Sequence, residues 1–366
     1  MPNPTEHVAA LAPYQLADLQ LAPGVEPIML AQNESLRGPS PMVAKAILKV
    51  ANCGRLYPDP HCHELAALLR QVHALPVQGR VLVGAGSMEL IGVLIRAYAG
   101  PGDEVLTSEF AYGYFAVATS IAGAEYVQAT EYRYTPDVDA LLAKVTDKTK
   151  IVIAVNPGNP TGTAIANDGI RRLRDALPKD TLLIVDEAYG EFTDAWQEPV
   201  FDLVGRGDCV VLRTLSKAYG LAAMRVGWGY FPDAVAQTMD KLLNPSRISM
   251  ISQKAAIAAV LDQDYMLATV SQTLAIGKEF KQAMVDAGLT VADSHTNFVL
   301  LKLADTTQAE MLEVALRRHG YLVRPMRAAL SDCIRITIGE QLVMQQLAEL
   351  IADLEPKLRA KKRPSE

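Results

Sequence analysis

The sequence has few cysteines, and none of them is spaced for a redox pair. Four cysteines occur in 366 residues, without a C-x-x-C pair. So few and scattered a set does not form a disulfide framework, and we expect a reducing cytoplasm. Cys53, His61, Cys62 and His63 lie close in sequence, but a four-ligand set at zinc-like spacing is missing. The sequence therefore predicts neither a disulfide scaffold nor a metal site.

A strong charge bias and long apolar runs are missing as well. The formal net charge is -6, and the basic residues cluster only at residues 359–363. Such an end is more often a solvated terminus than a binding surface, so we expect no nucleic-acid partner. No apolar run is long enough to span a bilayer, and residues 1–6 lack the features of a signal peptide. We expect neither membrane insertion nor export.

Short apolar runs alternate with helix-like stretches through the first two thirds of the chain. The runs lie at residues 81–83, 104–107, 125–127, 151–155, 182–185, 209–212 and 227–230. They are apolar at consecutive positions, which is typical of strands buried on both faces. The pattern predicts an α/β fold whose large domain has a mostly parallel seven-stranded sheet covered by helices. Loops at the strand ends are then the natural place for a ligand.

The pattern changes after about residue 245. A long helical pattern runs from residue 252 through 279 and beyond, and a helical stripe closes the chain at residues 342–358. Three strand candidates lie between them, at residues 298–301, 321–324 and 334–338. We expect a smaller α+β domain there. The predicted division is an extended N-terminal arm at residues 1–40, a large domain at 41–245 and a small domain at 246–366.

A lysine and an aspartate occupy positions that suit cofactor chemistry. Asp186 follows the apolar run at residues 182–185, where a buried carboxylate needs a charged or hydrogen-bonded partner. Lys217 lies in the segment T-L-S-K-A-Y-G-L at residues 214–221. Pyridoxal 5'-phosphate accounts for both, because it needs a lysine amine for a Schiff base and an acid for its pyridinium nitrogen. The sequence therefore predicts a cofactor enzyme.

Two loops together suit the phosphate of that cofactor. The segment G-A-G-S-M-E at residues 84–89 follows a predicted strand and opens a helix, so the N–H groups of Ser87 and Met88 can face an anion. Alone, this turn is equally consistent with a structural turn or a dinucleotide site, although G-x-G-x-x-G is not completed. A second loop adds hydroxyls and a permanent positive charge from Thr214, Ser216 and Arg225.

Three more side chains near strand ends are candidates for the cofactor ring and phosphate. Asn159 lies in N-P-G-N-P-T-G at residues 156–162, where its amide can donate to a phenolate-like oxygen, although this is also ordinary turn sequence. Tyr112 can stack on a planar ring, although an aromatic cluster is more often core. Tyr57 lies in a proline-rich loop before a helix, a position suited to reaching outward.

Two arginines of the predicted small domain are candidates for substrate binding. Arg335 interrupts the apolar run at residues 333–339, and a buried guanidinium needs a carboxylate or phosphate partner. Taken alone, an internal ion pair or an edge position is the commoner explanation. Arg324 is a second candidate for an anionic substrate group.

Together these segments resemble the class I/II pyridoxal-phosphate-dependent aminotransferases of fold type I, and among them the histidinol-phosphate aminotransferases most. The resemblance runs from about residue 31 to 339. Its most specific pieces are N-P-G-N-P-T-G, V-D-E-A-Y at residues 185–189, T-L-S-K-A-Y-G-L, and Arg335 in its strand.

The resemblance implies a role for each candidate. Lys217 would form the Schiff base, Asp186 would pair with the pyridine nitrogen, and Tyr189 with Asn159 would bind the phenolic oxygen. Tyr112 would stack on the ring. The phosphate would be held by Ser87, Met88, Thr214, Ser216 and Arg225, with Tyr57 from the other subunit of a homodimer. The substrate side would contain Arg335 as the α-carboxylate clamp, Arg324 and Asn33.

The chain departs from the family at three places. Met88 stands where an acidic residue is usual, Ser35-Leu36 replaces Asn-Pro in the segment that begins at Asn33, and R-A-A-L at residues 327–330 stands in place of G-L-P. The last two departures fall near the expected substrate side. The leading interpretation is ping-pong transamination between glutamate and imidazole-acetol phosphate, and aromatic amino acids are the main rival substrates.

Three other functions are compatible with parts of this sequence. A decarboxylase or β-eliminase would use the same lysine and aspartate, and product analysis separates it from an aminotransferase. A nicotinamide-dependent dehydrogenase leaves Lys217 and Asp186 unexplained. A non-catalytic binding module of this fold would be expected to carry an added DNA-binding domain, for which the predicted arm has no room.

Overall fold

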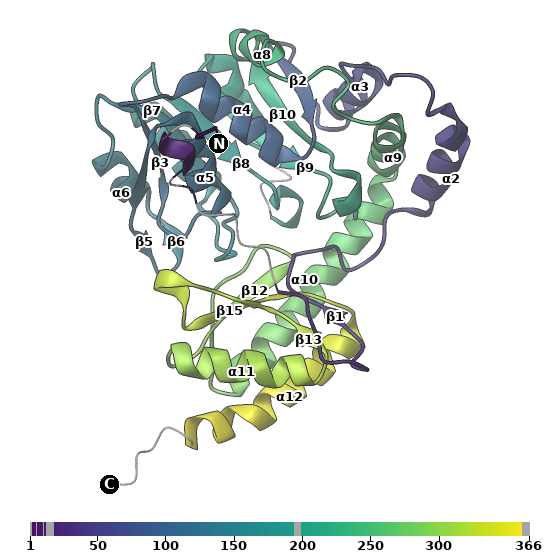
Figure 1. Ribbon diagram of the computed structural model, residues 1–366, viewed down its shortest axis with the longest axis vertical. Coiled ribbons are helices and arrows are strands. Elements are labelled where there is room, and N and C mark those ends of the chain that lie inside the picture. Colours follow the sequence, from purple (N-terminus) through teal and green to yellow (C-terminus); the bar gives the residue numbers. More distant parts are fainter. Residues whose placement is uncertain (1, 5, 10, 12–17, 194–198, 361–366) are drawn as a thin grey trace.

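The structure is a computed structural model that describes residues 2–4, 6–9, 11, 18–193 and 199–360. Figure 1 shows a larger upper part built on one sheet and a smaller lower part that contains the C-terminal elements. Most of the predicted basic cluster, residues 361–363, lies outside the described residues.

A seven-stranded sheet forms the larger part. Its strand order is β2-β10-β9-β8-β7-β3-β4, and β10 runs antiparallel to both of its neighbours. The other neighbours pair in parallel, which confirms the mostly parallel sheet predicted from the continuous apolar runs. In this order the strands are Gly79–Gly84, Gly227–Pro232, Cys209–Thr214, Leu182–Asp186, Thr149–Val155, Glu104–Ser108 and Glu125–Ala129.

Helices cover both faces of this sheet, as continuous apolar strands require. One face packs against α4, α5 and α8, which span Ser87–Tyr98, Tyr114–Ala122 and Asp233–Asp240. The other packs against α2, α3, α6, α7 and α9, which span Pro41–Val50, His63–Val72, Val138–Ala143, Asn167–Ala176 and Met250–Leu261. Helix α9 therefore shares a core with the large sheet, and the predicted domain boundaries stay a prediction.

A four-stranded antiparallel sheet of order β11-β12-β15-β14 forms the smaller part. Its strands are Thr290–Val291, Phe298–Lys302, Cys333–Thr337 and Arg324–Pro325. It packs against three helices, α10, α11 and α12, which span Gln263–Asp286, Thr306–Arg318 and Gln341–Ala360. Strand β1 of the N-terminal segment, Ile28–Met29, pairs in parallel with β13, Tyr321–Leu322, and so lies beside this sheet (Figure 1).

Three details of the prediction were wrong. The long helix is divided at Asp262, whose side chain accepts the N–H of Tyr265 and so caps the second helix, α10. The single strand expected at residues 321–324 is two short strands in different sheets, because β13 pairs with β1 whereas β14 pairs with β15. The N-terminal arm is not wholly extended, since it includes the short helix α1, Glu6–Ala9, besides β1.

Other properties of the described residues bear on partners. No described helix is long and apolar enough to cross a membrane. All four cysteines are free thiols. The described part of the chain contains no group of three or more His, Cys, Asp or Glu side chains arranged to hold a metal ion.

Candidate active site

The carboxyl ends of β8 and β9 bring the predicted aspartate and lysine to one edge of the large sheet. The register pairs Asp186 with Leu212, and the N–H of Glu187 donates to Leu212 O at 2.8 Å. Lys217 follows shortly after β9 ends at Thr214. Parallel neighbours end at the same edge, so two positions far apart in sequence meet because their strands are adjacent.

Asp186 is a buried acid. It is 4% exposed, and its Oδ1 accepts the N–H of Ala188 at 3.2 Å. Burial raises the pKa of Asp186 to about 7, with a further contribution from Glu187, and the Ala188 hydrogen bond opposes this rise. A cation against the carboxyl would offset the desolvation and favour the ionised form. Asp186 thus fits the protonated pyridine nitrogen of pyridoxal 5'-phosphate.

The amine of Lys217 has a lowered pKa. Its Nζ donates to the carbonyl oxygens of Gln32 at 3.1 Å and Asn33 at 2.9 Å. Burial lowers the pKa of Lys217 to about 7, and the positive charge of Arg335 adds to this effect. Near neutral pH a substantial fraction of this amine is unprotonated, which is the form that attacks a carbonyl carbon.

Two glycines open the predicted phosphate site. A Cβ on Gly86, which has φ +81°, would lie 2.6 Å from Arg225 Nη2, and a Cβ on Gly227 would lie 2.2 Å from the backbone N of Ser87. The absence of these atoms lets the guanidinium and the first turn of α4 approach each other. The first N–H groups of a helix have no partner within it and carry positive partial charge, so Ser87 and Met88 suit an anion.

The β9–β10 turn brings the second phosphate loop to the same place. Gly227 pairs with Thr214 on one side and with Gly84 on the other. Thr214 Oγ1 accepts the N–H of Ser216 at 3.1 Å, and both residues are buried. The predicted phosphate ligands, Ser87, Met88, Thr214, Ser216 and Arg225, therefore come from neighbouring strand ends.

Arg335 joins the substrate side to the cofactor side. Its Nη1 donates to Asn159 Oδ1 at 2.6 Å, and its Nη2 donates to Ala31 O at 2.9 Å. Because the amide oxygen of Asn159 faces a guanidinium, the amide nitrogen is the group left to donate, as the predicted contact with a phenolic oxygen requires. Arg324 lies directly opposite Arg335 in the β14–β15 register, so the two side chains share one face of the sheet.

Asn33 lies at the centre of a buried network beside the lysine. Its Nδ2 donates to the hydroxyl of Tyr189 at 2.8 Å, and its backbone N–H donates to Thr337 Oγ1 at 3.0 Å. Sequence reasoning missed Asn297, whose Nδ2 donates to the carbonyl oxygens of Asn33 at 3.1 Å and Glu34 at 2.9 Å. A polar residue directly before the apolar run at residues 298–301 was the available signal.

Tyr112 contacts one of the residues that depart from the family. Its hydroxyl donates to Met88 Sδ at 3.3 Å, and its ring meets Phe115 edge to face, with the centroids 5.9 Å apart. Met88 thus touches the predicted stacking residue through its side chain, in addition to presenting its N–H at the start of α4.

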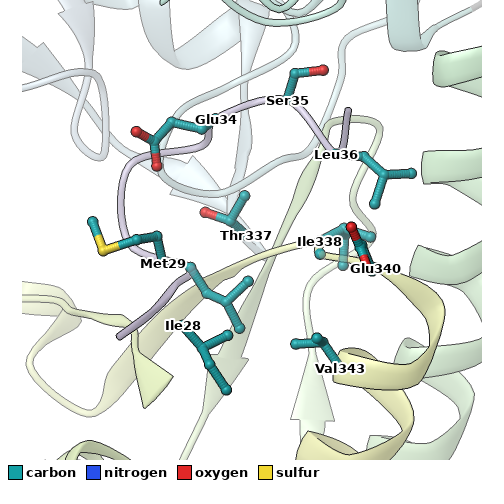
Figure 2. A pocket seen from close by; sticks show the side chains of 11 residues that line it. Ile28, Met29, Glu34, Ser35, Leu36, Thr337, Ile338, Glu340 and Val343 are labelled. Atoms are coloured by element: carbon teal, nitrogen blue, oxygen red, sulfur yellow. The ribbon is translucent and has the colours of Figure 1, made fainter. Parts of the chain in front are cut away.

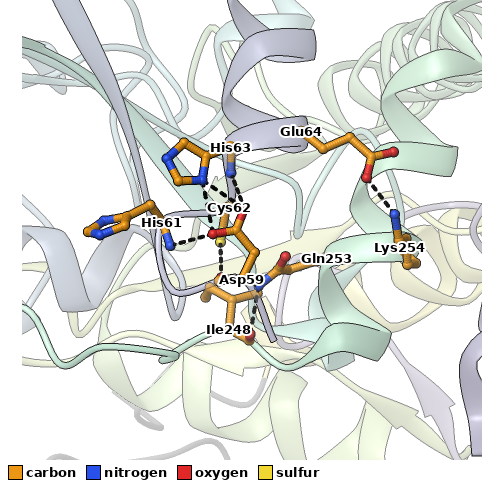
Figure 3. Close-up of polar contacts among 8 residues, drawn as sticks. All are labelled: Asp59, His61, Cys62, His63, Glu64, Ile248, Gln253 and Lys254. Atoms are coloured by element: carbon orange, nitrogen blue, oxygen red, sulfur yellow. Dashed lines mark hydrogen bonds and ion pairs between the residues drawn. The ribbon is translucent and has the colours of Figure 1, made fainter. Parts of the chain in front are cut away.

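Tyr57 lies in a loop that is fixed to the rest of the chain while its own side chain is 91% exposed. Asp59 accepts the N–H groups of His61 at 3.0 Å and His63 at 2.7 Å, and Gln253 of α9 donates to Asp59 O at 2.8 Å (Figure 3). These hydrogen bonds fix the loop, so the exposed side chain of Tyr57 extends from a segment that is held in place.

The two substrate-side departures also have defined places. Ser35 and Leu36 line a cavity of about 180 Å³ together with Thr337 and residues near the start of α12 (Figure 2). Residues 328–330 form a short 3-10 helix whose Leu330 packs near Phe110 and Tyr134, beside the hairpin of β5 and β6, Glu131–Tyr132 and Thr135–Pro136. Both departures therefore border the strands that carry Arg335 and Arg324.

This geometry agrees with the comparison to known families. The sequence matches the family model described as "Aminotransferase class I and II" over residues 25–352. The chain therefore belongs to the class I and II aminotransferases, which are pyridoxal-phosphate-dependent enzymes of fold type I acting on small amino and keto acids. The family, fold and cofactor predicted from the sequence are confirmed.

Histidinol-phosphate aminotransferases are prominent among the similar proteins. That of Rhodospirillum centenum is 38% identical over 363 residues, which cover 96% of this chain and 98% of the relative. That of Jannaschia sp. (strain CCS1) is 36% identical over 359 residues, with the same shares of each chain. The crystal structure of the Sinorhizobium meliloti enzyme in complex with pyridoxal-5'-phosphate matches with a TM-score of 0.87 at 28% identity and covers 99% of both chains.

Proposed function

We propose that this aminotransferase acts on histidinol phosphate, exchanging its amino group with 2-oxoglutarate in a ping-pong reaction. The near full-length likeness to histidinol-phosphate aminotransferases supports this substrate. The observation that carries the chemistry is the Lys217 amine, whose pKa is lowered to about 7 by burial and by Arg335. A substrate anion on Arg335 would lie within electrostatic reach of the reacting amine.

We assign the cofactor contacts as follows. Asp186 would hold a proton at the pyridine nitrogen, and Asn159 and Tyr189 would donate to the phenolic oxygen. The ring would lie against Tyr112. The phosphate would be held by Ser87, Met88, Thr214, Ser216 and Arg225. The strand register and the two glycines support the set, because the strands that end at Gly84, Asp186 and Thr214 have their carboxyl ends at one edge of the large sheet.

When bound, pyridoxal 5'-phosphate supplies an aldehyde that links to amines and a protonated ring that withdraws electrons. Lys217 would hold the cofactor through its amine until the amino donor takes its place. When free, its Nζ would take the proton from the substrate Cα as a general base and, as a general acid, would deliver it to the cofactor carbon that had carried the aldehyde oxygen. An amine with a pKa of about 7 suits both directions of this transfer near neutral pH.

The substrate side must accept two different anions. Glutamate presents an α-carboxylate, whereas histidinol phosphate presents a phosphate and no carboxylate. Arg335 offers a planar guanidinium that binds either group through two donors, and Arg324 shares its face of the sheet. We assign Arg335 to the α-carboxylate and Arg324 to a second anionic group. Asn33 would border the substrate here, where its side chain is hydrogen-bonded to Tyr189.

The exposed tyrosine points to a second subunit. We propose a cytoplasmic homodimer in which Tyr57 of each chain reaches the phosphate in the other chain's site. The support is the combination of a braced loop and a phenol that is 91% exposed. Exposed apolar side chains of the same region, Met42, Leu48 and Leu56, suit burial against a second copy.

A substrate assay tests the proposed function. Histidinol phosphate, phenylalanine and tyrosine are each supplied with 2-oxoglutarate, and formation of glutamate is measured. We expect the highest kcat/KM for histidinol phosphate. Turnover of the aromatic amino acids alone would replace the substrate while leaving the transamination intact, and release of carbon dioxide or ammonia without glutamate would exclude transamination.

A further inference from the structure

Three buried ionisable residues lie directly beside the site and have no role in the reaction described above. Arg213 immediately precedes Thr214, and Glu187 immediately follows Asp186. The Nε and Nη2 of Arg213 donate to Glu187 Oε2 at 2.9 and 2.7 Å, and its Nη1 lies 4.0 Å from Glu191 Oε1. We call Arg213, Glu187 and Glu191 the Arg213 cluster.

The cluster joins the two segments that carry the cofactor-site residues. Glu187 and Glu191 flank Tyr189 in the segment that leaves β8, whereas Arg213 lies near the end of β9, shortly before the segment that carries Lys217. The register between β8 and β9 ends at the pair Asp186 and Leu212. Beyond that pair, hydrogen bonds between the side chains of Arg213 and Glu187 connect the two segments.

Burying the Arg213 cluster carries a desolvation cost, and it restricts a neighbouring position. All three residues are less than 5% exposed. A Cβ on Gly190 would lie 3.3 Å from Arg213 Cζ, so a side chain at this position would crowd the guanidinium. Well-packed apolar residues commonly replace buried ion pairs without loss of stability, so stability alone does not explain such an arrangement. Fixing one geometry of the two segments does explain it.

The two acids of the cluster are not equivalent. Glu187 Oε2 receives both hydrogen bonds of the guanidinium, whereas both oxygens of Glu191 are buried without a hydrogen-bond partner among the described residues. Burial raises the pKa of Glu191 to about 7. Burial raises the pKa of Glu187 as well, but the charge and the hydrogen bonds of Arg213 oppose that rise. We therefore take Arg213 with Glu187 as the ionised pair, and Glu191 as a neighbour that is mostly neutral below pH 7.

We propose that Arg213 and Glu187 are positioning residues of the cofactor site, whose buried ion pair holds Asp186 and Tyr189 in register with Thr214 and Lys217. Glu191 completes the packing as a neutral acid. The proposal rests on the cofactor roles assigned above to Asp186 and Lys217.

The surroundings of the cluster define what else can titrate there. The Arg213 guanidinium lies 5.0 Å from the centroid of the Phe201 ring. Burial and then the positive charge of Arg213 lower the pKa of His73 to about 2, so this imidazole is neutral. Burial raises the pKa of Tyr219, which also stays neutral. Among the described residues, the charge of the cluster therefore changes only through Glu187, Glu191 and Arg213.

The test uses the full-length protein and three variants: Glu187→Gln, Glu191→Gln, and the double variant Arg213→Met with Glu187→Gln. The double variant contains no unpaired buried charge, so it tests the link even if a single variant folds poorly. The measurements are the dissociation constant for pyridoxal 5'-phosphate and the pH midpoint of the visible absorbance of the lysine-linked cofactor. Thermal melting of the cofactor-free protein checks folding.

We expect the double variant to fold but to bind the cofactor at least 10-fold more weakly, with a shifted pH midpoint. Glu191→Gln should stay within about twofold of the unsubstituted protein in both measurements, because it mimics a neutral acid. A folded double variant with unchanged affinity and midpoint would overturn the proposal alone. If the unsubstituted protein shows no lysine-linked cofactor, the proposed function fails together with it.

Discussion

The two sides of the site are built in different ways. The cofactor side, which holds Asp186 and Lys217, consists of loops that leave neighbouring strands of the large sheet. The substrate side, which holds Arg335 and Asn33, joins the small sheet to the N-terminal segment, and its Asn33–Thr337 contact spans 304 positions of sequence. The cofactor side follows from strand order, whereas the substrate side depends on segments that meet only in the folded chain.

This difference shows where the chain is free to vary. On the cofactor side, the proposed role of Met88, the one departure there, is to contact the phosphate through its backbone N–H, which a side-chain change leaves in place. On the substrate side, Ser35 and Leu36 line a cavity, and Leu330 packs near Phe110. Changes there alter the shape that a substrate meets. The reaction type is therefore fixed more firmly by the structure than the substrate is.

The largest effect should come from the cofactor side, with Lys217→Ala. Loss of the amine removes both the covalent link and the proton carrier, and we expect kcat to fall by about 10⁴-fold. Cofactor should still bind through its phosphate, but without the absorbance of the lysine-linked form. Lys357→Ala, on the exposed face of α12, is the matched control. Normal turnover by Lys217→Ala would remove this lysine from the mechanism.

Asp186→Asn should lower kcat by about 10³-fold, because a neutral amide does not hold a proton at the pyridine nitrogen. The same substitution should raise the stability of the cofactor-free protein. Burial raises the folded pKa of Asp186 from the ordinary value of 3.8 to about 7, so the folded state binds the extra proton between these values and loses stability as pH rises through them.

The Asn variant lacks that penalty. Its melting temperature without cofactor should therefore gain on that of the unsubstituted protein as pH rises from about 4 to 7. Asp180→Asn, at an exposed aspartate, should show neither effect. A gain that appears on lowering the pH instead would mean that the Asp186 carboxyl is stabilised as an anion in the folded protein.

On the substrate side, Arg335→Gln should raise the KM for glutamate by about 10²-fold, the cost of losing a charged, two-donor contact with a carboxylate. Cofactor binding should change far less, which separates the two sides of the site. Steady-state kinetics and a cofactor titration measure the two quantities, with Arg172→Gln on the surface as the control. Equal losses in both would show that Arg335 belongs to the cofactor side.

The smallest effect should come from Tyr57→Phe. Removing one hydroxyl donor to the charged phosphate should weaken cofactor binding by about 10-fold. Tyr132→Phe, another exposed tyrosine, should leave the affinity unchanged. Dilution should weaken cofactor binding in the unsubstituted protein if the dimer completes the site. An unchanged affinity in Tyr57→Phe would place this tyrosine outside the phosphate site.

The sequence specified the cofactor side better than the substrate side for a physical reason. Continuous apolar runs and the polar residues at their ends are local signals, so the sheet and the positions of Asp186 and Lys217 could be predicted. Asn297 was missed because its partners are the backbone oxygens of a segment more than 260 positions away. The link between Arg335 and Asn159 likewise appears only when the two sheets face each other.

The most direct test is to locate the covalent attachment of the cofactor. The protein is loaded with pyridoxal 5'-phosphate, reduced with borohydride, digested, and its peptides are measured by mass spectrometry. We predict that the added mass lies on the peptide that contains Lys217 and on no other lysine. Attachment at a different lysine, or no attachment, would contradict the assignment of the strand ends of β8 and β9 as the active site.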